Sequence, residues 1–235
     1  MGLSGATLLV GSCEPFSGKS ALVMGLVQQL RERGQSLRYG KPLATSIEQH
    51  NSGDALIDDD VRFVGEIFDL PDSALLPSLT SSTPEPTKEQ LATGSLVPAE
   101  QALEQLRGVL GDGEGITLLE AAGSLNEGLL FGLSLPQLAH GLKAPVVRAH
   151  AWEDARSVEP LLQAKALLGD QLLGVVVTNV EPDQITALRA ELSPALEALG
   201  LPLYGLLPRS PLLRGVTVGE LVQRLRAEML CCRER

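Results

Sequence analysis

The sequence predicts an α/β fold in three layers, with a mostly parallel central sheet and helices on both faces. Short apolar runs alternate with amphipathic helical segments along most of the 235 residues, which is the pattern of parallel strands joined by crossover helices. The polar motifs fall where predicted strands end, and folds of this class bind ligands beyond the carboxyl ends of their strands. The length fits a single core.

The first part of the chain begins with a fully apolar strand over 6–12, followed by a helix over 17–34 that carries one apolar stripe. A second strand is expected over 36–44, where Pro42 interrupts the pattern, and a second helix over 58–70. These segments begin the alternation of strands and helices that the fold class requires.

Residues 71–94 are rich in Pro, Ser and Thr and lose any periodicity. We therefore expect a long loop, which spans 71–97 in full. It would act as a lid or insertion rather than as a linker between domains. A helix over 98–111 and a buried strand over 115–123 then resume the alternation.

The second half of the chain continues the same pattern. We expect strands over 144–151, 171–180 and 201–208, and helices over 134–143, 158–169, 182–200 and 217–230. Residues 1–230 are therefore predicted to form one domain, with 231–235 as a tail.

The composition excludes several classes of function. Hydrophobic residues make up 44% of the chain, and its formal net charge is -10, which disfavours binding to nucleic acid or to an anionic membrane surface. The amino-terminal stretch has no basic region before its short apolar run, so it does not have the pattern of a signal peptide. No apolar run approaches the ~20 residues of a membrane span. We expect a cytoplasmic protein.

Cysteine and histidine residues do not indicate a metal centre. Cys13, Cys231 and Cys232 make no disulfide framework and lack a second ligand pair at zinc spacing. The three histidines share no spacing typical of a metal site or a catalytic triad, and they are His50, His140 and His150.

Residues 11–20 read GSCEPFSGKS and join the first strand to the first helix. Backbone N–H groups at the start of a helix form a nest for an anion, which the helix dipole reinforces. Gly18 would let the backbone approach a phosphate, Lys19 would reach the β- and γ-phosphates, and the Ser20 hydroxyl would bind Mg²⁺. Because Cys13 stands where the usual pattern has glycine, the segment is either a specialised nucleotide loop or an ordinary turn.

Two more charged residues end predicted strands. Lys41 is either a cation over a phosphate or substrate carboxylate, or a solvated lysine at the end of its strand. Glu120 leaves a buried strand near the expected nest, where an acid is the usual partner of Mg²⁺, although a carboxylate at the rim is the alternative.

Asp58, Asp59 and Asp60 open a predicted helix, where they would stabilise the helix N-terminus, and only one of them can point toward a metal at once. Asn179 ends a strand. Its amide could both donate to and accept from an adenine edge, or it could shape a turn.

Seven stretches occur in order over nearly the whole chain: GSCEPFSGKS, GKPLAT, DDDVRFVGEIFDL, LLEAAGSLNEG, GLSLPQLAHGLKAPVV, LLGVVVTNVEP and LYGLLPRSPLL. Together they resemble the dethiobiotin-synthetase-like P-loop NTPase domain at the N-terminus of phosphotransacetylase-family proteins, in its cyanobacterial form. The sequence contains no acetyl-transfer domain, so phosphotransacetylase activity is not expected of it. Longer relatives continue into a regulatory domain named for an Asp-Arg-Thr-Gly-Gly run, which the tail over 231–235 would begin.

The resemblance implies ATP and Mg²⁺ as ligands. Lys19 and Lys41 would act on the phosphates and substrate, and the loop of these synthetases also carries an acid at the position of Glu14. Mg²⁺ would be held by Ser20, Asp60 and Glu120. The residues implied in nucleotide binding are Glu14, Pro15, Phe16, Ser17, Gly18, Lys19, Ser20, Ala21, Asn179 and Pro208.

The sequence departs from the synthetase pattern at two places. Pro15 and Phe16 replace a threonine and an acid in the loop, and the run that begins at Glu120 reads Glu-Ala-Ala-Gly-Ser instead of Glu-Gly-Ala-Gly. We therefore expect nucleotide binding without biotin synthesis. Glu14 stands where ATPases of the septum-positioning and plasmid-partition type carry an extra lysine, so that subclass is not expected.

Three hypotheses follow. The first is an ATP-binding domain with a regulatory or sensing role and slow or no hydrolysis, which a regulatory domain or protein partner would read. The second is an ATP-dependent ligase that activates a carboxylate or carbamate, and the third is a scaffold that binds no nucleotide. The altered loop favours the first over the second, and the retained lysines and acids argue against the third. A homodimer is expected by analogy with other domains of this fold.

Overall fold

The computed structural model describes residues 5–47 and 55–210. The expected helix over 217–230, the tail over 231–235, His50, and the cysteines Cys231 and Cys232 lie outside the described residues.

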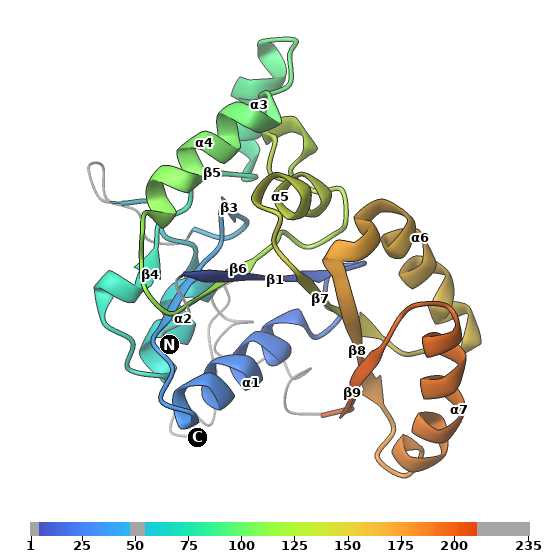
Figure 1. The fold of residues 1–235 in the computed structure, drawn as a ribbon. Coiled ribbons are helices and arrows are strands. Elements are labelled where there is room, and N and C mark those ends of the chain that lie inside the picture. Colours follow the sequence, from blue (N-terminus) through green and yellow to red (C-terminus); the bar gives the residue numbers. More distant parts are fainter. Residues whose placement is uncertain (1–4, 48–54, 211–235) are drawn as a thin grey trace, which may run out of the picture.

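The centre of the molecule is a parallel sheet in the order β4-β2-β6-β1-β7-β8-β9 (Figure 1). Its strands are β1 (Ala6–Ser12), β2 (Leu37–Gly40), β4 (Leu75–Leu76), β6 (Ile116–Glu120), β7 (Val146–Ala151), β8 (Leu172–Val180) and β9 (Leu203–Pro208). The predicted three-layer α/β sandwich with a mostly parallel sheet is confirmed, and β1 lies in the middle of it.

Helices cover both faces of this sheet (Figure 1). They are α1 (Lys19–Glu32), α2 (Asp59–Ile67), α3 (Pro84–Ala92), α4 (Ala99–Leu110), α5 (Leu135–Leu142), α6 (Glu159–Leu168) and α7 (Ile185–Ala198). Short 3-10 turns occupy Asp72–Ala74, Leu129–Phe131, Ala155–Val158 and Gly169–Gln171. The helices expected over 17–34, 58–70, 98–111, 134–143, 158–169 and 182–200 are confirmed within a few residues.

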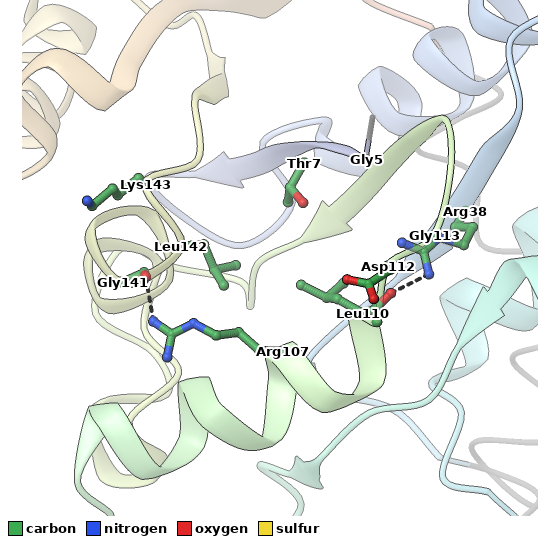
Figure 2. A pocket seen from close by; sticks show the side chains of 11 residues that line it. Gly5, Thr7, Arg38, Arg107, Leu110, Asp112, Gly113, Gly141, Leu142 and Lys143 are labelled. Carbon is green, nitrogen blue, oxygen red and sulfur yellow. Dashed lines mark hydrogen bonds between the residues drawn. The ribbon is translucent and has the colours of Figure 1, made fainter. Parts of the chain in front are cut away.

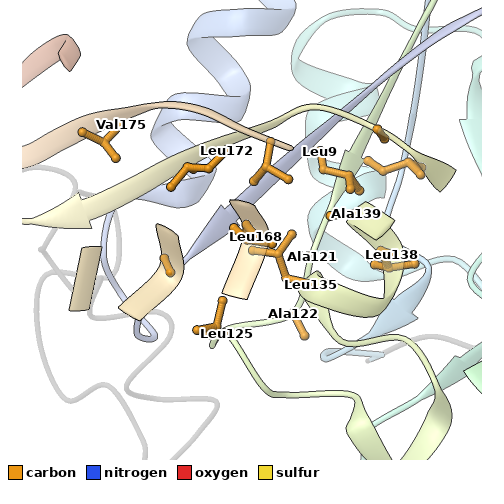
Figure 3. Packing of buried hydrophobic residues seen from close by; sticks show 14 of the residues in the cluster. Leu9, Ala121, Ala122, Leu125, Leu135, Leu138, Ala139, Leu168, Leu172 and Val175 are labelled. Carbon is orange, nitrogen blue, oxygen red and sulfur yellow. The ribbon is translucent and has the colours of Figure 1, made fainter. Parts of the chain in front are cut away.

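Two apolar clusters hold the layers together. One joins one face of the sheet to α4, α5, α6 and α7, and the other joins the opposite face to α1 and α2. Figure 3 shows part of the first cluster, where Leu9, Leu135 and Leu172 come from β1, α5 and β8. Burial of aliphatic side chains on both faces explains why the strands read as continuous apolar runs.

The expectation of a long loop without helix or strand over 71–94 is wrong, while its role as a lid or insertion stays a prediction. The segment contains β4, β5 (Thr80–Ser81) and α3, and β5 pairs with β3 (Leu43–Ala44) in a separate two-stranded sheet. The strands have two residues each, and α3 buries no side chain among its nine residues, so neither produces a periodic apolar pattern. The interruption at Pro42 is confirmed, since β2 and β3 belong to different sheets.

Strand register brings the functional positions to one level of the sheet. Val10 of β1 lies opposite Glu120 of β6, and Gly11 lies opposite Arg148 of β7. Because all these strands run parallel, the loops that follow them meet at one edge of the sheet.

The packing of α4 gives a test of the core. Leu106 is 1% exposed within the first cluster, whereas Leu91 on α3 is 67% exposed. We expect Leu106→Ala to lower the free energy of unfolding by about 2–5 kcal/mol through lost burial and a residual cavity, and Leu91→Ala to change it by less than about 0.5 kcal/mol. Urea unfolding followed by circular dichroism measures both, and equal losses would contradict this packing.

Candidate functional site

The loop between β1 and α1 is held by hydrogen bonds from distant elements. Ser12 Oγ donates to the carbonyl oxygen of Gly123 at 2.8 Å, and Thr178 Oγ1 donates to the carbonyl oxygen of Ser17 at 2.8 Å. The Ser17 hydroxyl donates in turn to the carbonyl oxygen of Glu14. Contacts from the ends of β6 and β8 therefore fix the backbone of the loop, whatever its outer side chains are.

Gly18 precedes α1 with φ 80° and ψ 17°, a left-handed conformation. A Cβ atom at this position would lie 2.9 Å from the Thr178 side chain, so glycine is required both by its torsion angles and by the close approach of β8. The first N–H groups of the 14-residue helix α1 follow directly, in the geometry of an anion nest.

The middle of the loop points outward. Glu14, Pro15 and Phe16 are exposed, and Phe16 is fully exposed with φ 60°. Ser20 is also exposed at the start of α1, and Ala21 is partly buried beside it. A ligand at the nest would therefore meet the backbone of residues 14–18 rather than their side chains.

Lys19 lies across the end of β6. Its ammonium group is 2.8 Å from Glu120 Oε1 and donates to the carbonyl oxygen of Ala121 at 2.5 Å. Glu120 is 1% exposed, and its Oε1 is paired with this ammonium group. The lysine of the loop thus neutralises a buried carboxylate that would otherwise be costly.

Tyr39 completes the surroundings of Glu120 from β2. Its hydroxyl donates to Glu120 Oε2 at 2.5 Å. Burial raises the pKa of Tyr39 well above its usual value, and the neighbouring Glu120 carboxylate adds to the effect. The tyrosine therefore stays neutral and acts as a hydrogen-bond donor to the carboxylate.

Lys41 forms a second buried ionic cluster just beyond β2. Its ammonium group is 2.7 Å from Asp60 Oδ2 and 3.2 Å from Asp58, and it donates to Thr45 Oγ1 at 2.5 Å. The side chain is only 2% exposed, so the alternative of a solvated strand-end lysine is wrong. Burial lowers the pKa of Lys41, but the carboxylates of Glu120 and its aspartate partners more than offset this, so the pKa is raised overall.

The three aspartates at the start of α2 have different environments. Asp58 is fully buried and caps the helix, accepting from the N–H groups of Asp60, Thr45 and Ser46. Asp59 accepts from the Ser46 hydroxyl. Asp60 is 45% exposed and faces Lys41. Helix capping accounts for Asp58, which leaves Asp60 as the aspartate that is both partly exposed and paired with Lys41.

Three oxygen-donor side chains near Lys19 and Lys41 fit Mg²⁺. The Ser20 hydroxyl is exposed, the Asp60 carboxylate is partly exposed, and Glu120 Oε1 has the Lys19 ammonium group at 2.8 Å. Hard oxygen donors are the ligands that this ion prefers. Within residues 5–47 and 55–210, no three His, Cys, Asp or Glu side chains are placed together as a metal site. A metal ion here would therefore need oxygen ligands from a bound phosphate or water as well.

Asn179 and Pro208 lie at adjoining strand ends. Val180 of β8 pairs with Pro208 of β9, and Asn179 has φ 62° while its Nδ2 donates to the carbonyl oxygen of Trp152 at 3.2 Å. The left-handed backbone agrees with a turn residue, and the side chain is placed beside the same edge of the sheet as the loop.

The comparisons with known proteins agree with this geometry. A family model described as an AAA domain matches residues 6–217. The ATP-dependent dethiobiotin synthetase BioD of Pseudomonas aeruginosa strain PAO1 is 30% identical over 198 residues, covering 82% of this chain and 85% of the synthetase. The chain therefore belongs to the family of dethiobiotin-synthetase-like P-loop domains. A second synthetase, from strain UCBPP-PA14, is 29% identical over 198 residues, with the same coverage of 82% and 85%.

Solved structures show the same fold for this dethiobiotin-synthetase-like P-loop domain. A variant of Cyanothece McdA, solved as a complex with ATP, superposes with a TM-score of 0.53 at 14% identity, covering 98% of this chain and 100% of that chain. The septum site-determining protein MinD of Pyrococcus horikoshii OT3, solved with Mg-ADP, gives a TM-score of 0.50 at 12% identity, covering 89% and 84%. At these identities the likeness concerns the fold alone, and the prediction from Glu14 that the chain is not of the septum-positioning subclass stands as a prediction.

Several residues of the dethiobiotin-synthetase-like site were missed by sequence reasoning. Tyr39 reads as an apolar strand residue, and only its tertiary contact with Glu120 gives it a polar role. Thr178, one residue before Asn179, fixes the loop, and its place in a polar strand ending could have drawn attention.

In the part of the chain that the structure describes, every helix is too short or too polar to cross a membrane.

An open hollow of about 530 Å³ lies at the opposite edge of the sheet, near the amino ends of β1, β2 and β6 (Figure 2). Arg38 and Arg107 line it, but they donate to the carbonyl oxygens of Leu110 and Gly141. Because these two cations are already engaged and the P-loop lies at the carboxyl ends of the strands, this hollow is separate from the family's phosphate loop.

The ionic cluster at Lys41 gives a test of the site. Lys41→Met would leave the carboxylate of Asp58 buried without this cation, and we expect a loss of about 3–5 kcal/mol in the free energy of unfolding. Lys88→Met, at an exposed position of α3, is the matched control and should change stability by less than about 0.5 kcal/mol. Chemical unfolding of both variants at pH 7 measures the difference, and similar midpoints would contradict the ion pair.

Proposed function

We propose that this domain binds ATP with Mg²⁺ at the loop between β1 and α1, and that it serves a regulatory or sensing role with slow or no hydrolysis. The single observation that carries the proposal is the position of Lys19, which starts α1 beside an anion nest and is held by Glu120 and Ala121. An ATP-dependent relative that matches over 82% of the chain supports the choice of nucleotide.

The residues have distinct roles in this proposal. The backbone of residues 14–18 surrounds the phosphates, and Lys19 exchanges Glu120 and the Ala121 carbonyl for phosphate oxygens. Ser20, Asp60 and Glu120 would hold Mg²⁺, which supplies charge neutralisation of the phosphates. Lys41 lies 2.7 Å from Asp60 and would orient a phosphate or carboxylate there. Asn179, Pro208 and Ala21 would flank the nucleoside.

Slow turnover follows from the surroundings of the loop. Pro15 and Phe16 expose no hydrogen-bonding side chain toward a substrate, and Lys19 must leave a buried carboxylate before it meets a phosphate. Such a site binds nucleotide more readily than it positions an attacking group. A regulatory role also agrees with the expected context, in which this domain of 1–230 stands at the N-terminus of a phosphotransacetylase-family protein of cyanobacterial type.

A second candidate is an ATP-dependent ligase of the dethiobiotin-synthetase type. The specific observation in its favour is Lys41, whose raised pKa keeps it cationic beside the partly exposed Asp60, where it would attract a carboxylate or carbamate. In either case we infer a cytoplasmic protein, a homodimer across the nucleotide face by analogy, and a regulatory domain or protein partner that reads the bound state.

Nucleotide binding is tested by thermal unfolding. We expect ATP with Mg²⁺ to raise the melting temperature by about 2–8 °C at saturating ligand, and we expect Lys19→Ala to abolish the rise because it removes the cation that meets the phosphates. Lys88→Ala is the control that changes net charge equally at an exposed position and should keep the full rise. No shift of the wild-type chain with any nucleoside triphosphate would leave only the scaffold hypothesis.

The two ATP hypotheses are separated by phosphate release. The sensor predicts little phosphate from ATP with or without added carboxylates, whereas the ligase predicts at least about a tenfold stimulation by its own acceptor. Candidate carboxylates and CO₂ with a diamine are the acceptors to use, in a coupled assay of inorganic phosphate. Stimulation that Lys41→Met removes, while nucleotide binding survives, would establish the ligase and overturn the sensor.

A further inference from the structure

β7 carries two buried polar side chains that the phosphate loop does not use. Arg148 is 0% exposed and His150 is 4% exposed. Alternate residues of a strand face the same side, and Val146, two residues before Arg148, belongs to the cluster that packs with α5 and α6. Arg148 and His150 therefore face that same apolar side of the sheet.

The nitrogen atoms of these two side chains are buried without acceptors. Within residues 5–47 and 55–210, no guanidinium nitrogen of Arg148 and neither ring nitrogen of His150 makes a hydrogen bond of normal geometry. Their polar neighbours are the Cys13 thiol beside Arg148 and the backbone of Ser157 beside His150. Buried polar atoms in proteins are almost always paired, and a guanidinium group carries five N–H donors that need acceptors. Arg148 and His150 are neighbours on one face of the strand, and in the described part of the chain the nitrogen atoms of both lack hydrogen-bond acceptors. This indicates that an acceptor shared by the two side chains is missing.

The place of Arg148 is beside the first residues of the phosphate loop. It lies opposite Gly11 in the strand register, and Cys13, two residues further on, shares the side chain's surroundings. Burial raises the pKa of Cys13 to about 11, although the nearby guanidinium opposes this. The Cys13 thiol is therefore neutral at pH 7, and its sulfur is 3.5 Å from the carbonyl oxygen of Pro160.

The charge of Arg148 has no counterion within the described part of the chain. Burial lowers the pKa of Arg148, but an arginine still keeps its proton at neutral pH. The acids that influence His150 are Glu14 and Glu153, which are both exposed, and no carboxylate within the described ranges lies in ion-pair distance of Arg148. A buried cation without such a partner is strongly unfavourable.

We propose that Arg148 and His150 form a binding site for one small monovalent anion beside the phosphate loop. The guanidinium fork matches two acceptors of a planar oxyanion or the surface of a halide, and His150, whose pKa burial lowers, adds a donor as a neutral ring. Because both side chains are enclosed, the ligand is a halide or an oxyanion of the size of nitrate or formate.

This site is distinct from the hollows open to solvent. Neither the hollow of Figure 2 nor the groove of about 350 Å³ between α3 and α4 is lined by Arg148 or His150. The proposal also does not rest on nucleotide binding, since it concerns the opposite side of the sheet from α1. Its consequence is that the stability of the chain depends on which anion is present, beyond the effect of ionic strength.

The test compares melting temperatures at constant ionic strength. Sodium gluconate, whose anion is too large to enter, is replaced stepwise by sodium chloride, nitrate or formate. We expect a saturable rise of about 2–4 °C in the wild-type chain and no anion-specific rise in Arg148→Met. In gluconate alone Arg148→Met should melt higher than the wild type, because the substitution removes an unpaired buried charge and keeps an unbranched side chain. Arg189→Met, at an exposed position of α7, has the same change in net charge and should behave as wild type.

A second measurement does not depend on the variant folding. Crystals of the wild-type chain soaked in sodium bromide should show an anomalous peak within hydrogen-bond distance of the Arg148 guanidinium. The proposal would be overturned if the anion-specific rise in melting temperature persisted in Arg148→Met. It would also be overturned if the wild-type chain melted at the same temperature in gluconate and chloride and bromide bound only at the surface. Chloride, nitrate and formate curves of different midpoints identify whether a halide or a planar oxyanion is preferred.

Discussion

The carboxylate of Glu120 is the constraint on which the functional end of the molecule depends. It lies in the centre of the sheet edge, almost without solvent, between the ammonium group of Lys19 and the hydroxyl of Tyr39. A carboxylate in that position is tolerated only while both partners stay in place. One acid of β6 therefore ties the start of α1 and the end of β2 together, and the Lys41 cluster extends the same arrangement to α2.

The backbone conformation of the phosphate loop depends little on the side chains in the middle of the loop. Ser12, where the loop begins, donates to the carbonyl oxygen of Gly123 beyond β6, and Thr178 donates to the carbonyl oxygen of Ser17 near the end of the loop. The side chains of Glu14, Pro15 and Phe16 between them are exposed. A loop without the usual glycine at Cys13 can keep the same anion nest, because the nest depends on Gly18 and on main-chain contacts. The outer residues are then free to set which partner or substrate approaches, and they are where this chain departs from the synthetases.

Most of the fold could be predicted from sequence because its signals are local. The strands that lie between two helical layers are continuous apolar runs, and the helices carry stripes or stop at glycine. The failures have two causes: α3 buries no side chain and so has no apolar stripe, and the short strands depend on contacts between distant residues. β4 exists because Leu75 and Leu76 pair with Tyr39 and Gly40, which no local pattern announces.

Some residues of the candidate site could also be predicted from the sequence, and others could not. Lys41 and Glu120 could be picked out because charged residues at the ends of apolar strands are unusual, Lys19 because it belongs to the Gly-Lys-Ser ending of the loop, and Asp60 through the family resemblance. The structure joins all four in one group of neighbouring charged side chains. Tyr39 could not, since an aromatic residue in a strand is normally part of the core. Arg148 could not either, because its unpaired state is a property of its neighbours, not of its own sequence position.

Helix α3 is attached to the domain in a different way from the other helices. None of its nine residues is buried, and it is joined to the body through the short β3–β5 pairing and its contact with the Leu129–Phe131 turn. Opening this helix would expose little apolar surface, so its amide hydrogens should exchange with solvent through local fluctuations, at a much lower free energy than those of β1 or β6. The segment over 84–92 is thus the part of the domain whose order can change while the central sheet stays folded.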